Sequence, residues 1–201
     1  MTEPLLETDR TRFRRRAHRG SHDRAVVEAI LDDAYVCHVA FVVDVEPIVI
    51  PTAFVRIDDA LYLHGSVANH MLGVLAAGAP ASIAVTLLDA LVLARTAFHH
   101  SVNYRSVVLF GRGRAIDDPV HKRRVLAALL DKMVAGRAAN CRPPDDTELR
   151  ATLVVSFPIA EAAAKIRKGP PVPDEGDDAT LPHWAGVVPF ITTRGEPIPA
   201  N

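Results

Sequence analysis

The chain has 201 residues, of which 49% are hydrophobic, so it is long enough for one domain with a sizeable core and too apolar for wholesale disorder. The formal net charge of −1 gives no overall indication of a nucleic-acid-binding protein. Apolar runs such as residues 34–43 are too short to span a bilayer, and the N-terminal stretch lacks the apolar segment of a secretory signal. Cys37 and Cys141 show no CxxC spacing, which favours reduced thiols in a cytoplasmic protein.

The chain begins with an arginine-rich segment that is followed by a helix. Residues 1–20 carry six arginines, and such charge runs are usually solvated. We therefore expect a flexible arm or one that packs on a partner subunit, with a nucleic-acid-binding arm as the alternative. Apolar residues at helical spacing predict a helix over residues 22–34, with Ser21 or Asp23 as its N-cap.

Strands are predicted from residue 35 onward. Two β-branched runs, 35–43 and 47–57, are joined by Asp-Val-Glu and predict a hairpin, and a third strand is expected at 60–65. Residues 66–78 then predict a short helix that opens with a serine and ends with a glycine.

The second half of the chain continues this alternation. Residues 81–95 predict one long strand, or two strands separated by a turn at Asp89. Residues 105–117 predict another strand, with glycines where it bends. The pattern over 119–136 predicts the best-defined helix of the chain, with Asp118 as its N-cap and a proline in its first turn.

The C-terminal part predicts one more strand, a helix and a tail. Residues 151–159 are expected to form the strand, and residues 161–171 a short helix that Gly169 and the following prolines end. The tail 170–201 contains seven prolines and the only tryptophan. We expect it to wrap over the body of the protein or across a dimer partner, because proline this dense prevents a helix.

Short connections between these elements favour antiparallel pairing, because repeated parallel crossovers need longer links. A closed or partly closed barrel would protect the edges of such apolar strands. The sequence therefore predicts a mainly β fold with some α-helix. The expected divisions are an arm at 1–20, a barrel domain at 21–168 and a tail at 169–201.

The first candidate site lies where the strand that ends at His64 meets the next helix. Gly65 is expected to turn the backbone and Ser66 to open the helix, with Asn69 and His70 close behind. Free amides and a hydroxyl at a helix N-terminus bind anions such as phosphate. The alternative is an ordinary helix cap, because no GxGxxG or GxxxxGK[ST] motif is present.

The second candidate site is the polar start of the strand that leads into residues 105–117. Alternate side chains share a face in an extended segment, so Asn103 and Arg105 lie together. His99 and Ser101 join that face if the segment stays extended. Arginine binds phosphate or carbonyl oxygens in a bidentate manner, and asparagine donates and accepts at the edge of a heteroaromatic ring. The alternative is a polar loop before a strand.

The third candidate is an edge strand. Pro51 cannot donate to a sheet ladder, which predicts an edge or a bulge and leaves backbone groups of Val49, Ile50 and Thr52 available to a ligand. Metal binding and nucleophilic catalysis are not indicated, since HExxH, HxH and GxSxG patterns are missing from the sequence. Cys37 lies in an apolar strand and is expected in the core. We therefore assign no metal ligand and no catalytic residue.

Three segments in order, VIPTAF (49–54), LYLHGSVANHML (61–72) and FHHSVNYRSVVLFG (98–111), resemble the flavin-nucleotide-binding proteins of the pyridoxamine 5′-phosphate oxidase-like superfamily. The branch most similar to them is related to 5-nitroimidazole resistance reductases, which the tail segment PHWAGVVPF also resembles. This resemblance covers residues 20–165. It implies a split β-barrel, an antiparallel Greek-key barrel with flanking helices, that binds FMN at a homodimer interface.

The resemblance also implies which residues bind the cofactor. Ser66, Asn69 and His70 would meet the phosphate, although a serine-arginine pair is common in the family where this chain has Asn69-His70. Residues 50–52 would run along the isoalloxazine, and Trp184 would approach the flavin from the same or the second subunit. The full set is Ile50, Pro51, Thr52, His64, Gly65, Ser66, Asn69, His70, His99, Ser101, Asn103, Arg105, Ser106 and Trp184.

The function that this resemblance implies is FMN-dependent oxidation or reduction of a small molecule, with a nicotinamide cofactor or another reductant supplying electrons. One alternative is a flavin-binding storage or sensor protein without turnover, and another is a deazaflavin- or haem-binding relative on the same barrel. A true pyridoxamine 5′-phosphate oxidase is less favoured, because Arg194 is the only candidate near the C-terminus for binding a substrate phosphate. Nucleic acids and membranes are not expected partners.

Overall fold

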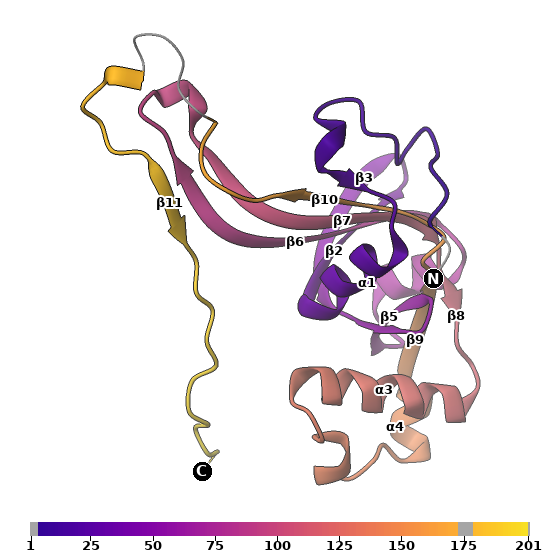
Figure 1. Ribbon diagram of the computed structural model, residues 1–201. Helices are drawn as coiled ribbons and strands as arrows, with labels where there is room; N and C mark the ends of the chain where they lie inside the picture. The colour runs from indigo at the N-terminus through magenta and orange to yellow at the C-terminus, as the bar shows by residue number, and fades with distance from the viewer. Residues whose placement is uncertain (1–3, 173–178, 201) are drawn as a thin grey trace. The chain divides into compact units, whose positions relative to one another are not determined.

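The computed structural model describes residues 4–172 and 179–200, which fall into two compact units (Figure 1). The first unit runs to Thr86 and includes Ser106–Lys165, and the second comprises Leu87–Arg105 and the chain from Ile166 onward. Within the described ranges, no helix combines the length and apolarity that a membrane span needs.

Antiparallel strands dominate the described part of the chain. One sheet has the order β1-β10-β7-β6-β2-β3, with β11 paired to β6, and a smaller sheet has the order β4-β5-β9-β8. The strands are β1 (Gly20–Ser21), β2 (Val36–Val43), β3 (Glu46–Ala53), β4 (Val55–Ile57), β5 (Ala60–Ser66), β6 (Pro80–Leu93), β7 (Ser101–Arg112), β8 (Arg114–Ala115), β9 (Thr152–Pro158), β10 (Glu161–Arg167) and β11 (Gly186–Pro189). Every pair with a defined register is antiparallel, as the short connections predict.

The predicted helices at 22–34 and 119–136 are confirmed. The α-helices are α1 (Arg24–Asp33), α2 (His70–Ala76), α3 (Pro119–Met133) and α4 (Asp146–Ala151), and the 3-10 turns are η1 (Ala17–Arg19), η2 (Ala97–His99) and η3 (Ala138–Asn140). The Asp23 carboxylate caps α1 by accepting from the Ala25 amide. The Asp118 carboxylate caps α3 by accepting from the amides of Val120 and His121. Both carboxylates satisfy amides that have no partner within the helix.

The predicted hairpin is confirmed as β2 and β3, which pair from Val36–Ala53 to Val43–Glu46. β3 is the last strand of its sheet, so the prediction that Pro51 marks an edge is also confirmed. The smaller sheet begins immediately afterwards at β4. The run 47–57, predicted as one strand, is therefore divided at Phe54, whose side chain is only 1% exposed.

One prediction from local pattern is wrong. Residues 161–171 do not form a helix, because Glu161–Arg167 is the strand β10, between β1 and β7. Its alanines favour a helix intrinsically, but as small side chains they are buried in the sheet, where tertiary packing overrides that preference. Of the two alternatives for residues 81–95, the single long strand is confirmed, because β6 continues through Asp89 without a turn.

The face of β6 that is buried changes along the strand. In the first unit Ala81, Ile83 and Val85 are buried, whereas in the second unit Ala90 and Val92 are buried. Successive side chains of a strand point to opposite faces, and the buried positions are odd-numbered in the first unit and even-numbered in the second. The change falls at the border between the two units.

The N-terminal arm is packed rather than solvated, which differs from the expectation for so many arginines. Leu5 and Thr11 are only 4% exposed, and the Leu5 amide donates to the His22 carbonyl over 2.8 Å. Thr8 and Arg10 both donate to the carboxylate of Glu161 on β10. The apolar side chain and the hydroxyl residues anchor the arm to its own chain, while most of its arginines stay exposed.

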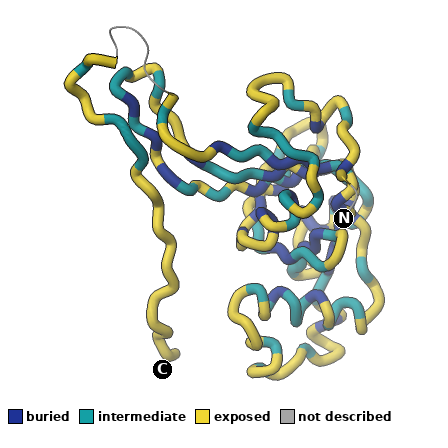
Figure 2. The backbone as a smooth tube through the Cα atoms, viewed as in Figure 1, coloured by how far each residue is buried: buried dark blue, intermediate teal, exposed yellow. Residues whose placement is uncertain are grey.

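The buried residues of the first unit include much of β5 and β9, whereas the chain after Val187 is exposed (Figure 2). Helix α2 packs against β5, β8 and β9. The closest approach is at Gly113, between β7 and β8. A Cβ atom there would lie 2.7 Å from the Leu75 carbonyl oxygen of α2 and 2.7 Å from Cγ1 of Val155. Only a residue without a side chain fits this contact.

We predict that Gly113→Ala destabilises the protein by about 2 kcal/mol, because overpacking against a backbone carbonyl and a buried valine forces the helix away from the sheet. Gly111→Ala is the matched control, since a Cβ there has its nearest neighbour at an ordinary 3.7 Å. Urea unfolding measures both. Equal stability losses in the two variants would contradict the proposed contact.

Candidate functional site

The segment from His64 to His70 differs in detail from its prediction. Ser66 does not open the helix but ends β5, where it lies opposite Thr152 of β9. Asn69 is the N-cap of α2, and its side-chain oxygen accepts from the Leu72 amide over 3.0 Å. The Ser66 hydroxyl oxygen accepts from the Ala68 amide over 3.1 Å. Protein groups therefore use several of the amides that were expected to be available, and two polar side chains organise the turn.

Gly65 does not turn the backbone, because it lies inside β5 opposite Leu153. A Cβ atom on Gly65 would lie 2.9 Å from Cδ1 of Leu72, so the glycine allows α2 to approach β5 closely. The side chains of Ser66, Asn69 and His70 are exposed at this junction. The structure thus brings a hydroxyl, an amide and an imidazole together on the surface of one short connection.

His64 is half-buried on β5, opposite Val154. Burial lowers its pKa from the ordinary value of 6.5, because the charged imidazolium loses hydration. At neutral pH this side chain is therefore neutral and offers one donor and one acceptor nitrogen.

The edge strand β3 carries residues 50–52 of the predicted set. Ile50 and Thr52 lie opposite Val39 and Cys37, and Pro51 lies opposite His38 with its side chain exposed. β3 also approaches β5 within the first unit, so these two predicted segments are neighbours. The remaining predicted residue of this unit, Ser106, donates from its hydroxyl to the Lys165 carbonyl over 3.2 Å.

Asn103 belongs to the second unit and is engaged there by the protein. It is 7% exposed, and its amide nitrogen donates to the Gly169 carbonyl over 3.0 Å. Its side-chain oxygen accepts from the guanidinium of Arg167, which is 5% exposed and also donates to the Gly169 and Pro170 carbonyls. This network holds the end of β10 against β7, so it gives Asn103 a structural role.

Arg105 shares the face of Asn103 in β7, as alternation predicts. Its guanidinium binds the Asp89 carboxylate of β6, with Nη2 and Oδ1 3.0 Å apart. Asp89, the charged residue within the otherwise apolar strand β6, therefore has its charge paired with that of Arg105. The Phe190 amide, next to β11, donates to the Asp89 backbone carbonyl. The sequence did not predict this pair, because Asp89 and Arg105 lie on different strands, 16 residues apart along the chain.

Three further predicted residues, His99, Ser101 and Trp184, also belong to the second unit. His99 lies in the turn η2 rather than in an extended segment, so alternation does not place it with Asn103. Its ring contacts Phe98 edge-on at 5.3 Å, while Ser101 is exposed at the start of β7. Trp184 is 63% exposed, and its ring lies over Gly186, where a Cβ atom would approach it to 2.7 Å.

The cysteine prediction is confirmed, because Cys37 is fully buried and burial raises the pKa of its thiol to about 12. In the described residues, no three His, Cys, Asp or Glu side chains gather as a metal site would require.

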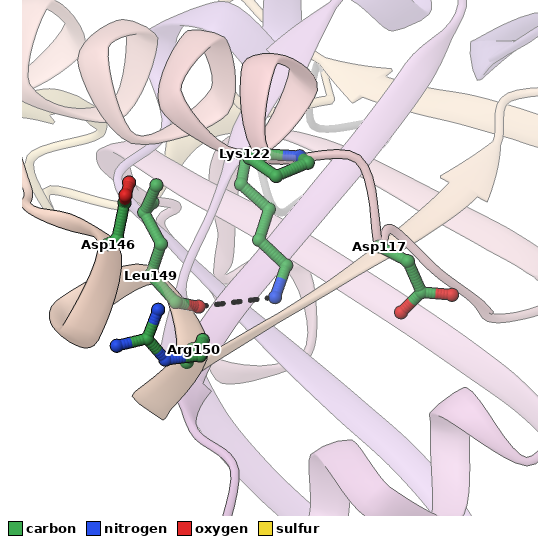
Figure 3. A pocket seen from close by; sticks show the side chains of 6 residues that line it. Asp117, Lys122, Asp146, Leu149 and Arg150 are labelled. Atoms are coloured by element: carbon green, nitrogen blue, oxygen red, sulfur yellow. Dashed lines mark hydrogen bonds between the residues drawn. The ribbon is translucent and has the colours of Figure 1, made fainter.

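A hollow of about 270 Å³ lies between α3 and α4 and contains none of the predicted residues (Figure 3). The Lys122 ammonium donates to the Leu149 and Thr152 carbonyls over 3.3 and 2.8 Å, which joins the two helices. Asp117, Asp146 and Arg150 complete its charged lining. With cations and carboxylates in balance, the hollow favours no ligand charge.

We predict that Asn103→Ala destabilises the protein by about 2 kcal/mol, because it removes an acceptor from a buried guanidinium. Ser101→Ala, an exposed change on the same strand, should alter stability by less than about 0.5 kcal/mol. Chemical denaturation measures both variants. If they are equally stable, the Asn103 amide is not needed by the protein and is available to a ligand.

Comparison with known proteins identifies the family to which this fold belongs. The chain matches the family described as pyridoxamine 5′-phosphate oxidase over residues 23–166. The structure of the flavocytochrome Anf3 from Azotobacter vinelandii is 38% identical, with a TM-score of 0.90 over 98% of this chain and 91% of that chain. The FAD and haem binding protein from Mycobacterium smegmatis is 39% identical, with a TM-score of 0.85 over 90% of this chain and 89% of that chain.

A candidate 5-nitroimidazole antibiotic resistance protein from Bacteroides thetaiotaomicron shares the fold, with 22% identity and a TM-score of 0.61 over 72% of this chain and 84% of that chain. Among the curated proteins, none matches the chain significantly. The mainly β, antiparallel fold and the superfamily resemblance inferred from the sequence are confirmed. The chain belongs to the pyridoxamine 5′-phosphate oxidase family and has its split β-barrel fold.

Proposed function

We propose that this protein binds a flavin at the junction of β5 and α2 and along the edge strand β3, and that it works in electron transfer with a small molecule. The observation that carries this proposal is the family match over residues 23–166, together with 38–39% identity to two proteins whose descriptions name a flavocytochrome and an FAD and haem binding protein.

The residues at the junction fit the phosphate end of a flavin. The Ser66 hydroxyl accepts from Ala68 and keeps its own proton for donation, and the His70 imidazole lies exposed beside it. Helix α2 has only seven residues, so the hydroxyl and imidazole side chains carry this assignment rather than a helix dipole. The phosphate is common to FMN, which the sequence resemblance implies, and to FAD, which occurs in the Mycobacterium smegmatis relative.

The edge strand fits the ring system. Because β3 ends its sheet, its outer backbone groups need a partner other than a strand of the described chain. A flavin ring offers such groups at its pyrimidine edge, and when bound it supplies hydride and single-electron chemistry. His64, neutral at neutral pH, lies on the neighbouring strand β5 and adds one donor and one acceptor. An electron donor such as NAD(P)H and the acceptor would use the open face of the ring.

A homodimer is part of this proposal. On the outer face of β2 and β3, Val36, Val42 and Val49 are 47%, 56% and 60% exposed. Val36 and Val42 alternate with the buried Cys37, Val39 and Phe41, and Val49 lies opposite Ala40 on the same face. Apart from His38, this face of the hairpin is apolar, without a covering layer in the described chain. A second copy of the chain would cover such a face. The tail 169–201 would then pack on its own barrel or on the partner.

We predict that Ser66→Ala combined with His70→Ala weakens flavin binding by about 30- to 1000-fold, because each change removes a phosphate contact worth about 1–2 kcal/mol. Quenching of flavin fluorescence during titration with FMN and with FAD measures the affinity. His18→Ala, an exposed change in the arm, is the control. Mass spectrometry of the small molecule released on denaturation identifies the bound flavin. Unchanged affinity in the double variant would remove the phosphate assignment.

A second candidate function, haem binding in addition to flavin, is favoured by the haem named for the Mycobacterium smegmatis relative. In the second unit, Leu88, Phe98 and Trp184 are exposed apolar side chains, as a porphyrin face requires. The Nδ1 atom of His100 lies 3.0 Å from the Thr96 carbonyl oxygen, so it donates a proton there. That bond leaves Nε2 as the nitrogen available to a haem iron, a pattern common to metal-bound histidines.

We predict that titration with hemin gives a Soret band and that His100→Ala abolishes or shifts it. His183→Ala is the matched control, since His183 is another exposed histidine of the same unit. The absorption spectrum of the reduced and oxidised protein measures the effect. A band that is identical in both variants would exclude His100 as the axial ligand.

A further inference from the structure

A slot of about 250 Å³ lies between the N-terminal arm and the larger sheet, inside the first unit. Residues 10–13 of the arm form one wall. Side chains of β7 and β10, among them Ser106, Phe110 and Lys165, form the other. The family match begins at residue 23, so one wall is built from a segment outside the matched region.

The lining combines aromatic rings with positive charge. Phe13 and Phe110 supply flat apolar surfaces, and the guanidinium carbon of Arg10 lies 4.8 Å from the centre of the Phe110 ring. Arg10, Arg12 and Lys165 supply three cations, and no carboxylate belongs to the lining in the described residues. The chemistry of the walls therefore suits an aromatic ring that carries negative charge.

The guanidinium groups of Arg10 and Arg12 each retain N–H groups that can donate to a ligand. Arg10 uses Nε and Nη2 on Glu161, and Arg12 uses Nε and Nη1 on Glu7 and Asp9, so one amino group of each guanidinium has no partner in the described chain. Lys165 donates to the Arg15 carbonyl and pairs with no described carboxylate. Residues 7–19 contain six arginines and only two carboxylates, which makes the arm strongly positive.

The slot is preformed rather than a gap under a loose chain. The arm is fixed at Leu5, Thr8 and Arg10, as described for the fold. The Phe13 ring is fixed by its contacts with Gly20, where a Cβ atom would not fit, and with the His22 ring, whose centre lies 5.1 Å away. A wall fixed in advance loses little conformational entropy when a ligand binds.

We propose that this slot binds an aromatic ring that carries a phosphate group, with the ring against Phe13 and Phe110 and the phosphate on Arg10 and Arg12. Guanidinium groups bind phosphate oxygens in pairs, and bases stack on aromatic and guanidinium surfaces. The volume is near the lower end for small-molecule sites, which fits one nucleotide rather than a complete dinucleotide. Two sources share this chemistry, a free mononucleotide and the adenylate half of FAD.

The test is an isothermal titration of AMP into the full-length protein saturated with FMN. We expect saturable binding that Arg12→Gln weakens by about tenfold, because one charge-assisted contact is lost. Val108→Trp, a half-exposed position in the slot lining, should abolish binding by filling the space. Arg14→Gln removes an arm arginine outside the lining and should leave the affinity within about twofold. Thermal melting verifies that the variants are folded.

The same titration on protein saturated with FAD distinguishes the two sources. If FAD excludes AMP and FMN does not, the slot holds the adenylate half of FAD; if AMP binds in both cases, the ligand is a free nucleotide. The proposal is overturned if AMP shows no saturable binding, or if Arg12→Gln and Arg14→Gln lower the affinity equally. Flavin binding is measured separately by its fluorescence, so failure of this proposal leaves the proposed function standing, and the reverse also holds.

Discussion

The structure depends on one strand that serves two hydrophobic cores. β6 buries Ala81, Ile83 and Val85 in the first unit and Ala90 and Val92 in the second. The border between the units falls where this alternation changes. The charged residue at this change, Asp89, is stabilised by Arg105 from the neighbouring strand. The Asp89–Arg105 ion pair thus lies in the stretch of β6 where the side chain is only partly buried.

Patterns that act over a few residues could be predicted from the sequence. The hairpin of β2 and β3, the caps Asp23 and Asp118 and the edge position of Pro51 all depend on neighbours within one turn or one strand pair. The capping box of α4, in which Asp145 and Glu148 satisfy each other's backbone amides, has the same local signal and was overlooked. β10 was missed because alanines have a helical preference that only its position between two strands overrides.

The candidate site shows the same division between local and distant information. That Ser66, Asn69 and His70 share one connection follows from their proximity in sequence. The role of Asn103 could not be predicted, because its partners Arg167 and Gly169 are more than 60 residues away along the chain. A polar residue at the start of a strand is compatible with a ligand and with a buried network. Which of the two holds depends on whether a distant part of the folded chain supplies hydrogen-bond partners for that residue.

The net charge of −1 does not reveal the positive charge that is concentrated in the N-terminal arm. Overall balance argues against a protein that binds polyanions along its surface, and that argument holds for the chain as a whole. It says nothing about a single small anion, because a few charges within one Debye length determine the potential in a slot. Here the arginines are concentrated before residue 20, and Glu161 fixes one of them over a sheet that carries Phe110 and Lys165. Packing of the arm turns a charge run, which in isolation would be solvated, into a wall with defined geometry.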